Sequence, residues 1–163
     1  MKSITAALLA VFSLLALTGC ETTKTNRKFE GIHSTRMAAM HDAIRLEPPG
    51  NYYIGRRYYK RDYKFWGYVR KPGQPWSTAK LVMMNEQQKL APDREKGLLG
   101  SDHNYEYKLF GEFSADPVYE PASNTIYPEF VLTGYEVLST NSPSLMRTAA
   151  ANDPLRRVID RPR

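Results

Sequence analysis

Three segments of this chain alternate residue by residue between two faces, and each carries a glycine in its interior. The segments are YKFWGYVR, YEYKLFGEF and EFVLTGYEVL, and the glycines are Gly67, Gly111 and Gly134. Alternation with a period of two predicts strands with one buried face. A glycine inside a strand permits a bend or a bulge. Strands bent in this way predict a closed or half-closed barrel rather than an open sheet.

Further strands and one helix complete the prediction of the fold. The run WSTAKLVMMNE follows the turn KPGQP, so residues 63–86 are expected to form a hairpin. Apolar residues at helical spacing predict a helix over residues 34–47, and the following Pro-Pro-Gly ends it. The expected fold is mainly β with one N-terminal helix (α+β), in the form of a small bent-strand β-barrel that is OB-like or SH3-like.

The first twenty residues, MKSITAALLAVFSLLALTGC, place one lysine before an uncharged apolar run that ends in the single cysteine of the chain. The run is shorter than the roughly 20 apolar residues that span a bilayer, and it suits the apolar region of a secretory signal. Its end, Leu17-Thr18-Gly19-Cys20, resembles the lipobox of bacterial lipoproteins. The resemblance implies that residues 1–19 are a signal peptide and that Cys20 carries a diacylglyceryl thioether. An ordinary signal peptide with a chance cysteine is the alternative.

The lipobox resemblance also implies a location. Two or more acyl chains anchor a protein stably, so the resemblance implies a lipid-anchored protein of the bacterial cell envelope. Glu21, rather than aspartate, follows the cysteine, which favours the outer membrane over the inner membrane where lipoproteins are sorted as in enterobacteria. We expect residues 20–33 to be the lipidated N-terminus and a tether, residues 34–140 a single globular β-rich domain, and residues 141–163 a short helix and a mobile basic tail.

The length suits one domain, and the basic charge fits either an anionic surface nearby or a solvated surface that binds nothing specific. The chain has 163 residues and a formal net charge of +6 at pH 7. With Cys20 lipidated, no thiol remains for a disulfide, so the core must hold the domain together. Nucleic acid is scarce outside the cytoplasm, and we therefore expect no nucleic acid among the partners.

Residue types of catalytic and metal sites occur without the spacing that their chemistry requires. Ser101, Asp102 and His103 are consecutive, and consecutive extended residues point to opposite sides, so they cannot line up as a triad. His33 and His41 are too far apart for the histidine pair of a zinc helix. The sequence therefore predicts no catalytic residues, no metal and no cofactor. An enzyme with a site in the loop 87–104 is the less favoured alternative.

The stretch NYYIGRRYYKRDYKFWGYVR, residues 51–70, interleaves aromatic and basic residues. On a strand, Trp66, Tyr68 and Arg70 are expected to share a face that points away from the core. Such residues are preferred anchors of protein interfaces, and arginine also pairs with phosphate. The candidate binding residues are Arg56, Arg57, Trp66, Tyr68, Arg70 and Trp76.

Three interpretations of this face stay open. The first is a binding or assembly module for another envelope protein. The second is a binder of an anionic envelope glycan or lipid, such as lipopolysaccharide or a peptidoglycan fragment. The third gives the face no partner: its aromatic rings pack under the N-terminal helix or the C-terminal tail while the basic groups reach water.

Overall fold

The structure, a computed structural model, describes the backbone of residues 21–162 and the side chains of residues 30–63 and 67–162. The chain divides into two compact units, residues 1–39 and residues 40–163. The predicted signal peptide and Cys20 lie outside the described residues.

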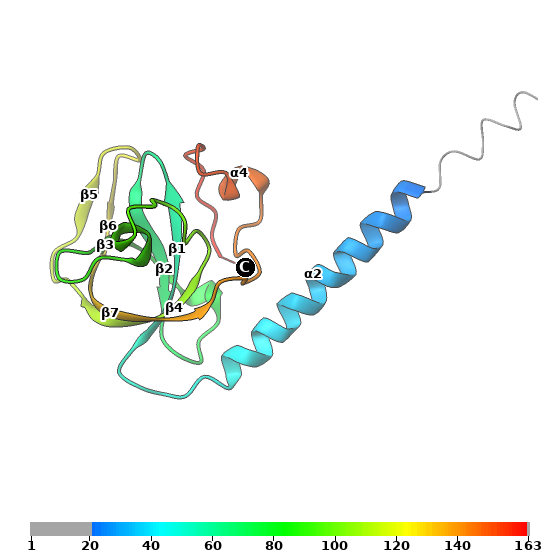
Figure 1. Cartoon of the computed structure of the whole chain (residues 1–163), viewed down its shortest axis with the longest axis horizontal. Helices are drawn as coiled ribbons and strands as arrows, with labels where there is room; N and C mark the ends of the chain where they lie inside the picture. Colours follow the sequence, from blue (N-terminus) through cyan, green and yellow to red (C-terminus); the bar gives the residue numbers. More distant parts are fainter. Residues whose placement is uncertain (1–20, 163) are drawn as a thin grey trace, which may run out of the picture. The chain divides into compact units, whose positions relative to one another are not determined.

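Five strands of the second unit close into a barrel, which confirms the predicted fold class (Figure 1). Their order around the barrel is β1-β2-β3-β7-β4, and β4 pairs with β1 to close it. The strands are β1 (Tyr53–Lys60), β2 (Lys64–Arg70), β3 (Lys80–Asn85), β4 (Glu106–Phe113) and β7 (Glu129–Ser139). Two short strands, β5 (Val118–Glu120) and β6 (Thr125–Tyr127), form a separate antiparallel pair.

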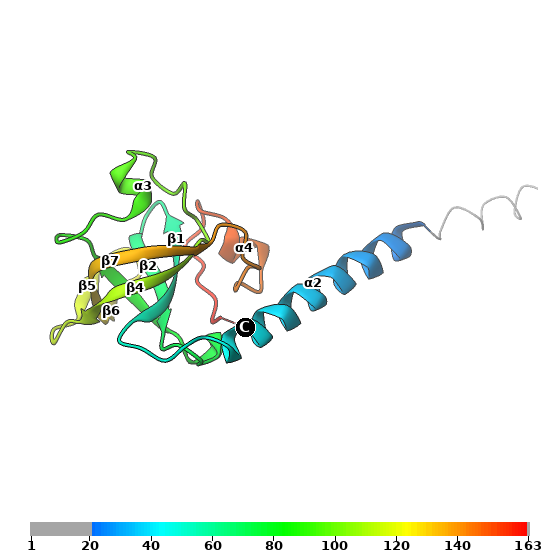
Figure 2. The ribbon, with the colours of Figure 1, turned by 60° about the horizontal axis from the view of Figure 1, so that its bottom comes forward.

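The barrel is a Greek key with one parallel seam. Strands β3 and β7 are parallel, and the other four pairs of barrel strands are antiparallel. Strand β7 runs beside β4 along its length (Figure 2). A parallel pair requires a long crossing connection, and here that connection contains β4, β5 and β6. This arrangement agrees with the OB-like alternative of the prediction.

The predicted strand irregularity lies where β4 meets β7. The register shifts between Phe110 and Gly111, opposite Gly134. Gly111 has a φ of 150°, and a Cβ there would lie 2.1 Å from the carbonyl oxygen of Val131. Only glycine tolerates this conformation and this close approach. Gly67, by contrast, lies in a regular register with β1.

The barrel interior is apolar and rich in aromatic rings. Phe130 is fully buried and makes edge-to-face contacts with Tyr53 and Phe113, at centroid distances of 5.2 and 5.4 Å. The other buried members of this core are Val69, Val82, Met84, Tyr107, Leu109 and Leu132. Each such side chain stabilises the fold by about 1.5–3 kcal/mol when it is buried. A core of this size accounts for a domain without disulfides.

Helix α2 (Glu21–Arg45) begins well before residue 34, so the segment expected to be a tether is helical from Glu21. Polar residues without apolar periodicity still form a helix when no proline interrupts them. Ser34 Oγ and Thr35 Oγ1 donate hydrogen bonds of 2.9 Å to the carbonyl oxygen of Gly31, as hydroxyl residues inside a helix do. In the second unit, Met40 and Ile44 of its last turns are buried.

Three short helical segments lie in the connections. They are the 3₁₀ segment η1 (Trp76–Thr78), α3 (Pro92–Glu95) and α4 (Ala149–Asn152). The segment η1 takes the place of the first residues of an expected strand, because Pro75 precedes Trp76 and a turn bonds Thr78 N to the Pro75 carbonyl at 3.0 Å. Thr148 Oγ1 accepts a 3.1 Å hydrogen bond from Ala151 N and so caps α4.

Candidate binding site

Five of the six predicted binding residues are buried rather than exposed. The exposed fraction is at most 5% for each of Arg56, Arg57, Tyr68, Arg70 and Trp76. The side chain of Trp66 lies outside the described residues. The expectation that these residues form an outward face is therefore wrong for the five described side chains. Both faces of the β1–β2 hairpin are covered, because segments distant in sequence pack on each of them.

Trp76 contacts the guanidinium groups of two of these arginines. The Cζ atoms of Arg56 and Arg70 lie 5.0 and 4.5 Å from the centre of its ring. Arg56 donates to Glu106 Oε2 at 2.6 Å, and Arg70 donates to both oxygens of Glu47 at 2.6 Å. Buried charges need partners of this kind. These residues therefore stabilise the barrel near η1 and leave no free aromatic face there.

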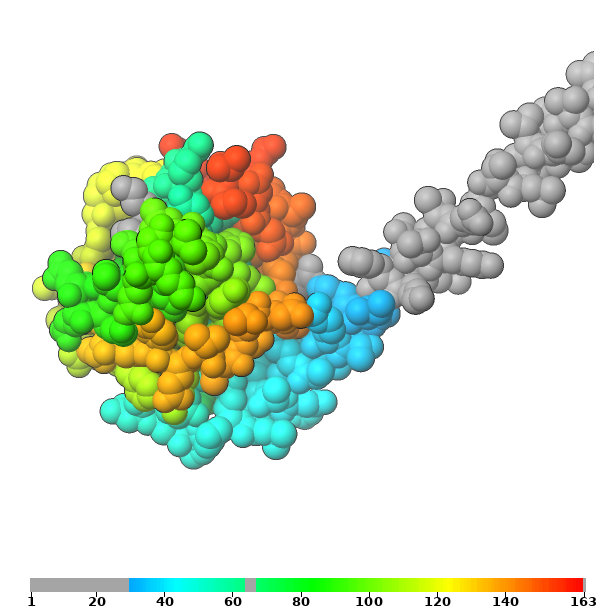
Figure 3. Space-filling model, viewed as in Figure 1, coloured from blue at the N-terminus to red at the C-terminus, as the bar shows by residue number. Residues whose placement is uncertain are grey.

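Arg57 of β1 joins three carboxylates from the connection between β3 and β4. Its Nη2 donates to Glu86 at 2.8 Å, and its Nη1 donates to Asp93 at 2.7 Å and to Asp102. All four side chains are buried. Figure 3 shows the segment that contains α3, in green, covering the middle of this side of the barrel. The cluster fixes this long connection to the barrel wall.

The two aspartates of the cluster have opposite pKa shifts. Burial raises the pKa of Asp102, although the nearby Arg57 favours its charged form. Burial would also raise the pKa of Asp93, but hydrogen bonds from the Gly100 N–H and from Arg57 outweigh it and lower that pKa. The pKa of Arg57 is raised, because its carboxylate partners outweigh the effect of burial.

The acid–base groups of loop 87–104 are engaged in structural contacts. Asp102 accepts a 3.1 Å hydrogen bond from the Tyr107 hydroxyl as well as the bond from Arg57. His103 Nδ1 accepts from the Tyr59 N–H at 3.2 Å, and burial lowers the pKa of His103. Because Nδ1 is the acceptor of this bond, His103 cannot donate a hydrogen bond to its neighbour Asp102 through that nitrogen.

The C-terminal segment packs along the β1–β2 hairpin, so the expectation of a mobile tail is wrong for the described residues (Figures 1 and 2). Lys60 Nζ donates to the carbonyl oxygens of Ala151 and Asp153 at 2.6 and 2.7 Å. Tyr63 donates to the Arg157 carbonyl at 2.8 Å, and Tyr68 donates to the carbonyl of Asp160. Such bonds satisfy polar groups that burial would otherwise leave without partners.

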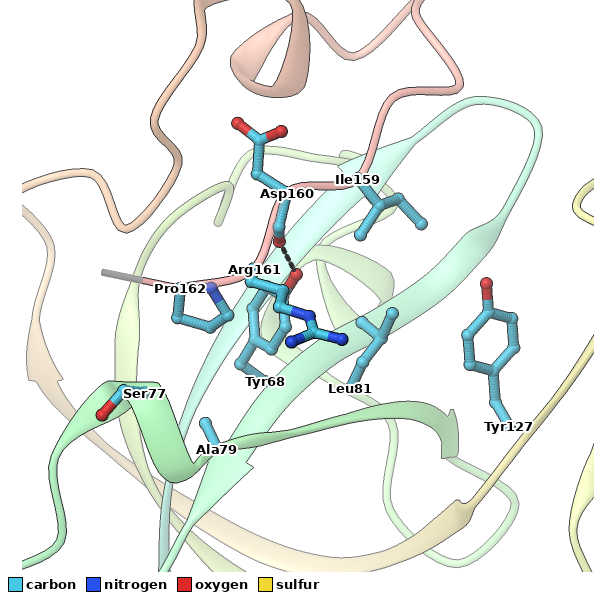
Figure 4. A pocket seen from close by; sticks show the side chains of 9 residues that line it. All are labelled: Tyr68, Ser77, Ala79, Leu81, Tyr127, Ile159, Asp160, Arg161 and Pro162. Atoms are coloured by element: carbon cyan, nitrogen blue, oxygen red, sulfur yellow. Dashed lines mark hydrogen bonds between the residues drawn. The ribbon is translucent and has the colours of Figure 1, made fainter.

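A pocket of about 490 Å³ lies between this segment and strands β2 and β3. We call it the tail pocket, and its lining residues are Tyr68, Ser77, Ala79, Leu81, Tyr127, Ile159, Asp160, Arg161 and Pro162. In Figure 4 the Arg161 guanidinium lies between Tyr68 and Leu81, with Tyr127 across the space. The Asp160 carboxylate turns away from the pocket and accepts from Thr148 N and Oγ1 at 3.0 Å.

The tail pocket offers one cation, aromatic rings and hydroxyl groups. Among the side chains of residues 30–63 and 67–162, no acid is paired with the exposed Arg161. Tyr127 supplies a half-buried ring, Leu81 supplies half-buried apolar surface, and Ser77 supplies an exposed hydroxyl group. Aromatic and apolar walls with a few polar groups are typical of small-ligand sites. The sequence pointed to Tyr68 alone among these residues, because the others come from segments that only the fold brings together.

Two further kinds of site are not found in the described part of the chain. No three His, Cys, Asp or Glu residues there are grouped so that they could hold a metal ion. Every helix there is too short or too polar to cross a bilayer.

Comparisons of the chain with protein-family models, with curated proteins and with solved structures give no significant match.

Proposed function

We propose that this protein is a lipid-anchored binding module of the bacterial envelope, without catalytic activity, and that its tail pocket binds an anionic glycan. The observation that carries the proposal is the position of Arg161, which has no acidic partner among the described residues and lies over aromatic and apolar walls. Sugars stack their apolar faces on aromatic rings, and a guanidinium pairs with carboxylate or phosphate groups.

The anchor part of the proposal comes from the sequence. The lipobox resemblance at Leu17 to Cys20 supports membrane attachment through Cys20, and Glu21 supports an outer-membrane destination. Metabolic labelling with palmitate tests it: the wild-type chain should incorporate label, and the Cys20→Ser variant should not. Incorporation by both chains would contradict the anchor.

The absence of catalysis is supported by the chemistry of the loop 87–104. Asp102 is held by Arg57 and Tyr107, and His103 is an acceptor for a backbone N–H. These are the groups that an enzyme with a site in this loop would use. Because the fold already engages them, we favour binding over catalysis.

The test of glycan binding uses a purified muropeptide and a lipopolysaccharide core oligosaccharide as probes in titration calorimetry. The chain carries Cys20→Ser so that no acyl group contributes. We expect Arg161→Ala to weaken binding by about tenfold or more, which equals roughly 1.4 kcal/mol. Binding should also weaken as salt rises, because exposed charges are screened.

The matched control for this test is Arg156→Ala. Arg156 is an exposed arginine of the same segment, paired only loosely with Asp153 at 3.8 Å, and it does not line the tail pocket. Arg156→Ala removes the same charge as Arg161→Ala and should leave the affinity for the glycan probes unchanged. Equal losses in the two variants, or no binding of either probe by the unmutated pocket, would contradict the proposal.

A second candidate function is binding of another envelope protein, as the sequence first suggested. The observation in its favour is a pair of exposed apolar residues on the β5–β6 hairpin: Tyr119 and Ile126 face each other in register and are 56% and 63% exposed. Exposed aromatic and aliphatic pairs of this kind are typical of protein interfaces. Cross-linking in membranes followed by mass spectrometry, with Tyr119→Ser/Ile126→Ser beside the wild type, tests this candidate.

A further inference from the structure

A second pocket, of about 340 Å³, lies on the other side of the segment 77–81. Ser77, Ala79 and Leu81 line the tail pocket, whereas the alternate residues Thr78 and Lys80 line this one. We call it the lysine pocket, and its lining residues are Tyr53, Val69, Arg70, Lys71, Gln74, Thr78, Lys80 and Phe113. It shares no lining residue with the tail pocket.

Two lysines of this pocket lie over adjacent aromatic rings. Lys71 Nζ is 3.9 Å from the centre of the Tyr53 ring, and Lys80 Nζ is 4.9 Å from that of Phe113. The two rings are themselves in edge-to-face contact, with their centres 5.5 Å apart. A ring face attracts an ammonium group and limits its motion, so the two cations are held side by side at the pocket wall.

The positive charge around the lysine pocket exceeds the negative charge that is paired with it in the described part of the chain. Within the described residues, neither Lys71 nor Lys80 is paired with a carboxylate. Arg70 adds a third positive charge, and Glu47 is the one carboxylate paired to it. The three cations and this one anion leave a local charge of +2. Glu47 does not line the pocket, and it also accepts a hydrogen bond from the Gly73 N–H at 2.8 Å.

The pocket lining also offers hydrogen-bond donors. The ammonium groups of Lys71 and Lys80 belong to exposed side chains. Gln74 adds an exposed side-chain amide to the pocket lining. The pocket therefore combines surplus positive charge with donors, which is the chemistry of an anion site.

We propose that the lysine pocket binds a phosphate monoester through Lys71 and Lys80. A monoester carries close to two negative charges at neutral pH, which matches the local surplus. The site is separate from the tail pocket and does not depend on glycan binding there. The monoester can belong to a soluble sugar phosphate or to a lipid headgroup, since both present the same group.

The test has a soluble arm and a lipid arm, both with the Cys20→Ser chain. The soluble arm measures binding of glucose 1-phosphate by titration calorimetry. The lipid arm measures flotation with phosphatidylcholine vesicles that contain phosphatidic acid, beside vesicles of phosphatidylcholine alone. The test variant is Lys71→Gln/Lys80→Gln. The matched control is Lys89→Gln/Lys96→Gln, which removes the same charge from lysines outside the pocket.

We expect binding in at least one arm, weakened about tenfold or more in the pocket variant and retained in the control. The arm that shows it identifies the source of the monoester. Equal weakening in both variants would show diffuse electrostatic attraction and overturn the proposal, as would the absence of binding in both arms. Should the double variant unfold, Lys80→Gln alone replaces it, since Lys80 is exposed.

Arg161→Ala separates this proposal from the proposed function. It should weaken binding of the muropeptide, whose anionic groups are carboxylates, and leave binding of glucose 1-phosphate or phosphatidic acid unchanged. Lys71→Gln/Lys80→Gln should weaken binding of glucose 1-phosphate or phosphatidic acid and leave binding of the muropeptide unchanged. A failure of one site therefore leaves the test of the other intact.

Discussion

At the scale of single residues, the main feature is the burial of arginines on both faces of β1. Arg56 and Arg57 are consecutive strand residues, so their side chains leave the strand on opposite sides. Arg57 is covered by the carboxylates of the connection between β3 and β4. Arg56 is covered on the opposite side by Glu106 and by the carbonyl group of Pro143. Such charges do not create an outward face, because each is neutralised by a segment distant in sequence.

Replacement of Arg57 by methionine tests the buried cluster. Arg57→Met leaves Glu86, Asp93 and Asp102 buried without their common partner. We expect the free energy of unfolding to fall by about 3–5 kcal/mol, because unpaired buried charges are strongly unfavourable. Urea unfolding followed by circular dichroism measures it. Arg61→Met, an exposed neighbour, is the control and should change stability by less than about 0.5 kcal/mol.

Substitution of the strand glycines tests the bulge between β4 and β7. Gly111→Ala places a Cβ against the Val131 carbonyl at a positive φ, so we expect a loss of about 1–3 kcal/mol. Gly134→Ala is the control, because its Cβ would meet Phe110 at an acceptable 3.4 Å. Thermal unfolding compares the two. A loss at Gly134 as large as that at Gly111 would show that backbone strain is not the cause.

At the scale of elements, the C-terminal segment acts as part of the barrel wall. Its sequence, NDPLRRVIDRPR, is basic and interrupted by prolines, which is typical of mobile tails. Yet its described residues, 152–162, add no regular strand or long helix, and their carbonyl groups accept hydrogen bonds from the barrel. Lys60, Tyr63 and Tyr68 donate to them. Bonds to backbone carbonyls leave no residue pattern in the accepting segment, so the sequence could not reveal this packing.

Deletion of residues 153–163 tests this role. The buried groups of Tyr63 and Tyr68 lose their acceptors, and Lys60 loses one of two. We expect the free energy of unfolding to fall by at least about 3 kcal/mol, at roughly 1 kcal/mol for each of these three hydrogen bonds, because the deletion also removes the bonds from Thr148 to Asp160. Differential scanning calorimetry measures the change. Leu155→Ser alters an exposed side chain of the same segment and should not change the free energy of unfolding measurably. A deletion that also leaves the free energy of unfolding unchanged would contradict the role of the segment in the barrel wall.

At the scale of the whole molecule, the fold could be predicted and the site could not. Alternation in three segments and the interior glycines identified a barrel, because strand period and backbone bending are local properties. The tail pocket joins Tyr68, Leu81, Tyr127 and Arg161, which four different segments supply. Only strand order and tail packing bring them together. The same long-range packing buried the aromatic and basic stretch that the sequence presented as a surface.

The balance of carboxylate pKa values predicts how the whole molecule responds to acid. The pKa values of Asp62, Asp93, Glu95, Glu120 and Asp160 are lowered in the fold, and that of Asp102 is raised. Groups with lowered pKa values stabilise the fold above their ordinary values and lose this effect as the pH falls through their folded values. The raised pKa of Asp102 has the opposite effect on stability and offsets a part of this loss.

We therefore expect the free energy of unfolding to decrease as the pH falls below about 4.5. Urea unfolding over a series of pH values measures this dependence. The variant Asp93→Asn removes one of the lowered groups, so its stability should fall less steeply in the same range. An unchanged slope in that variant would show that Asp93 does not contribute.

The place of β7 in the barrel has a consequence for the timing of folding. It is the last barrel strand along the chain, and it pairs with β3 on one side and with β4 on the other. Until residues 129–139 are available, both of those seams stay open and the sheet keeps two free edges. The strands β4, β1, β2 and β3 can pair in that order before then, but the barrel closes only when β7 joins β3 to β4. Because β3 and β4 pair with β7 and not with each other, a chain without residues 129–139 exposes two unpaired strand edges, which invite pairing with other chains.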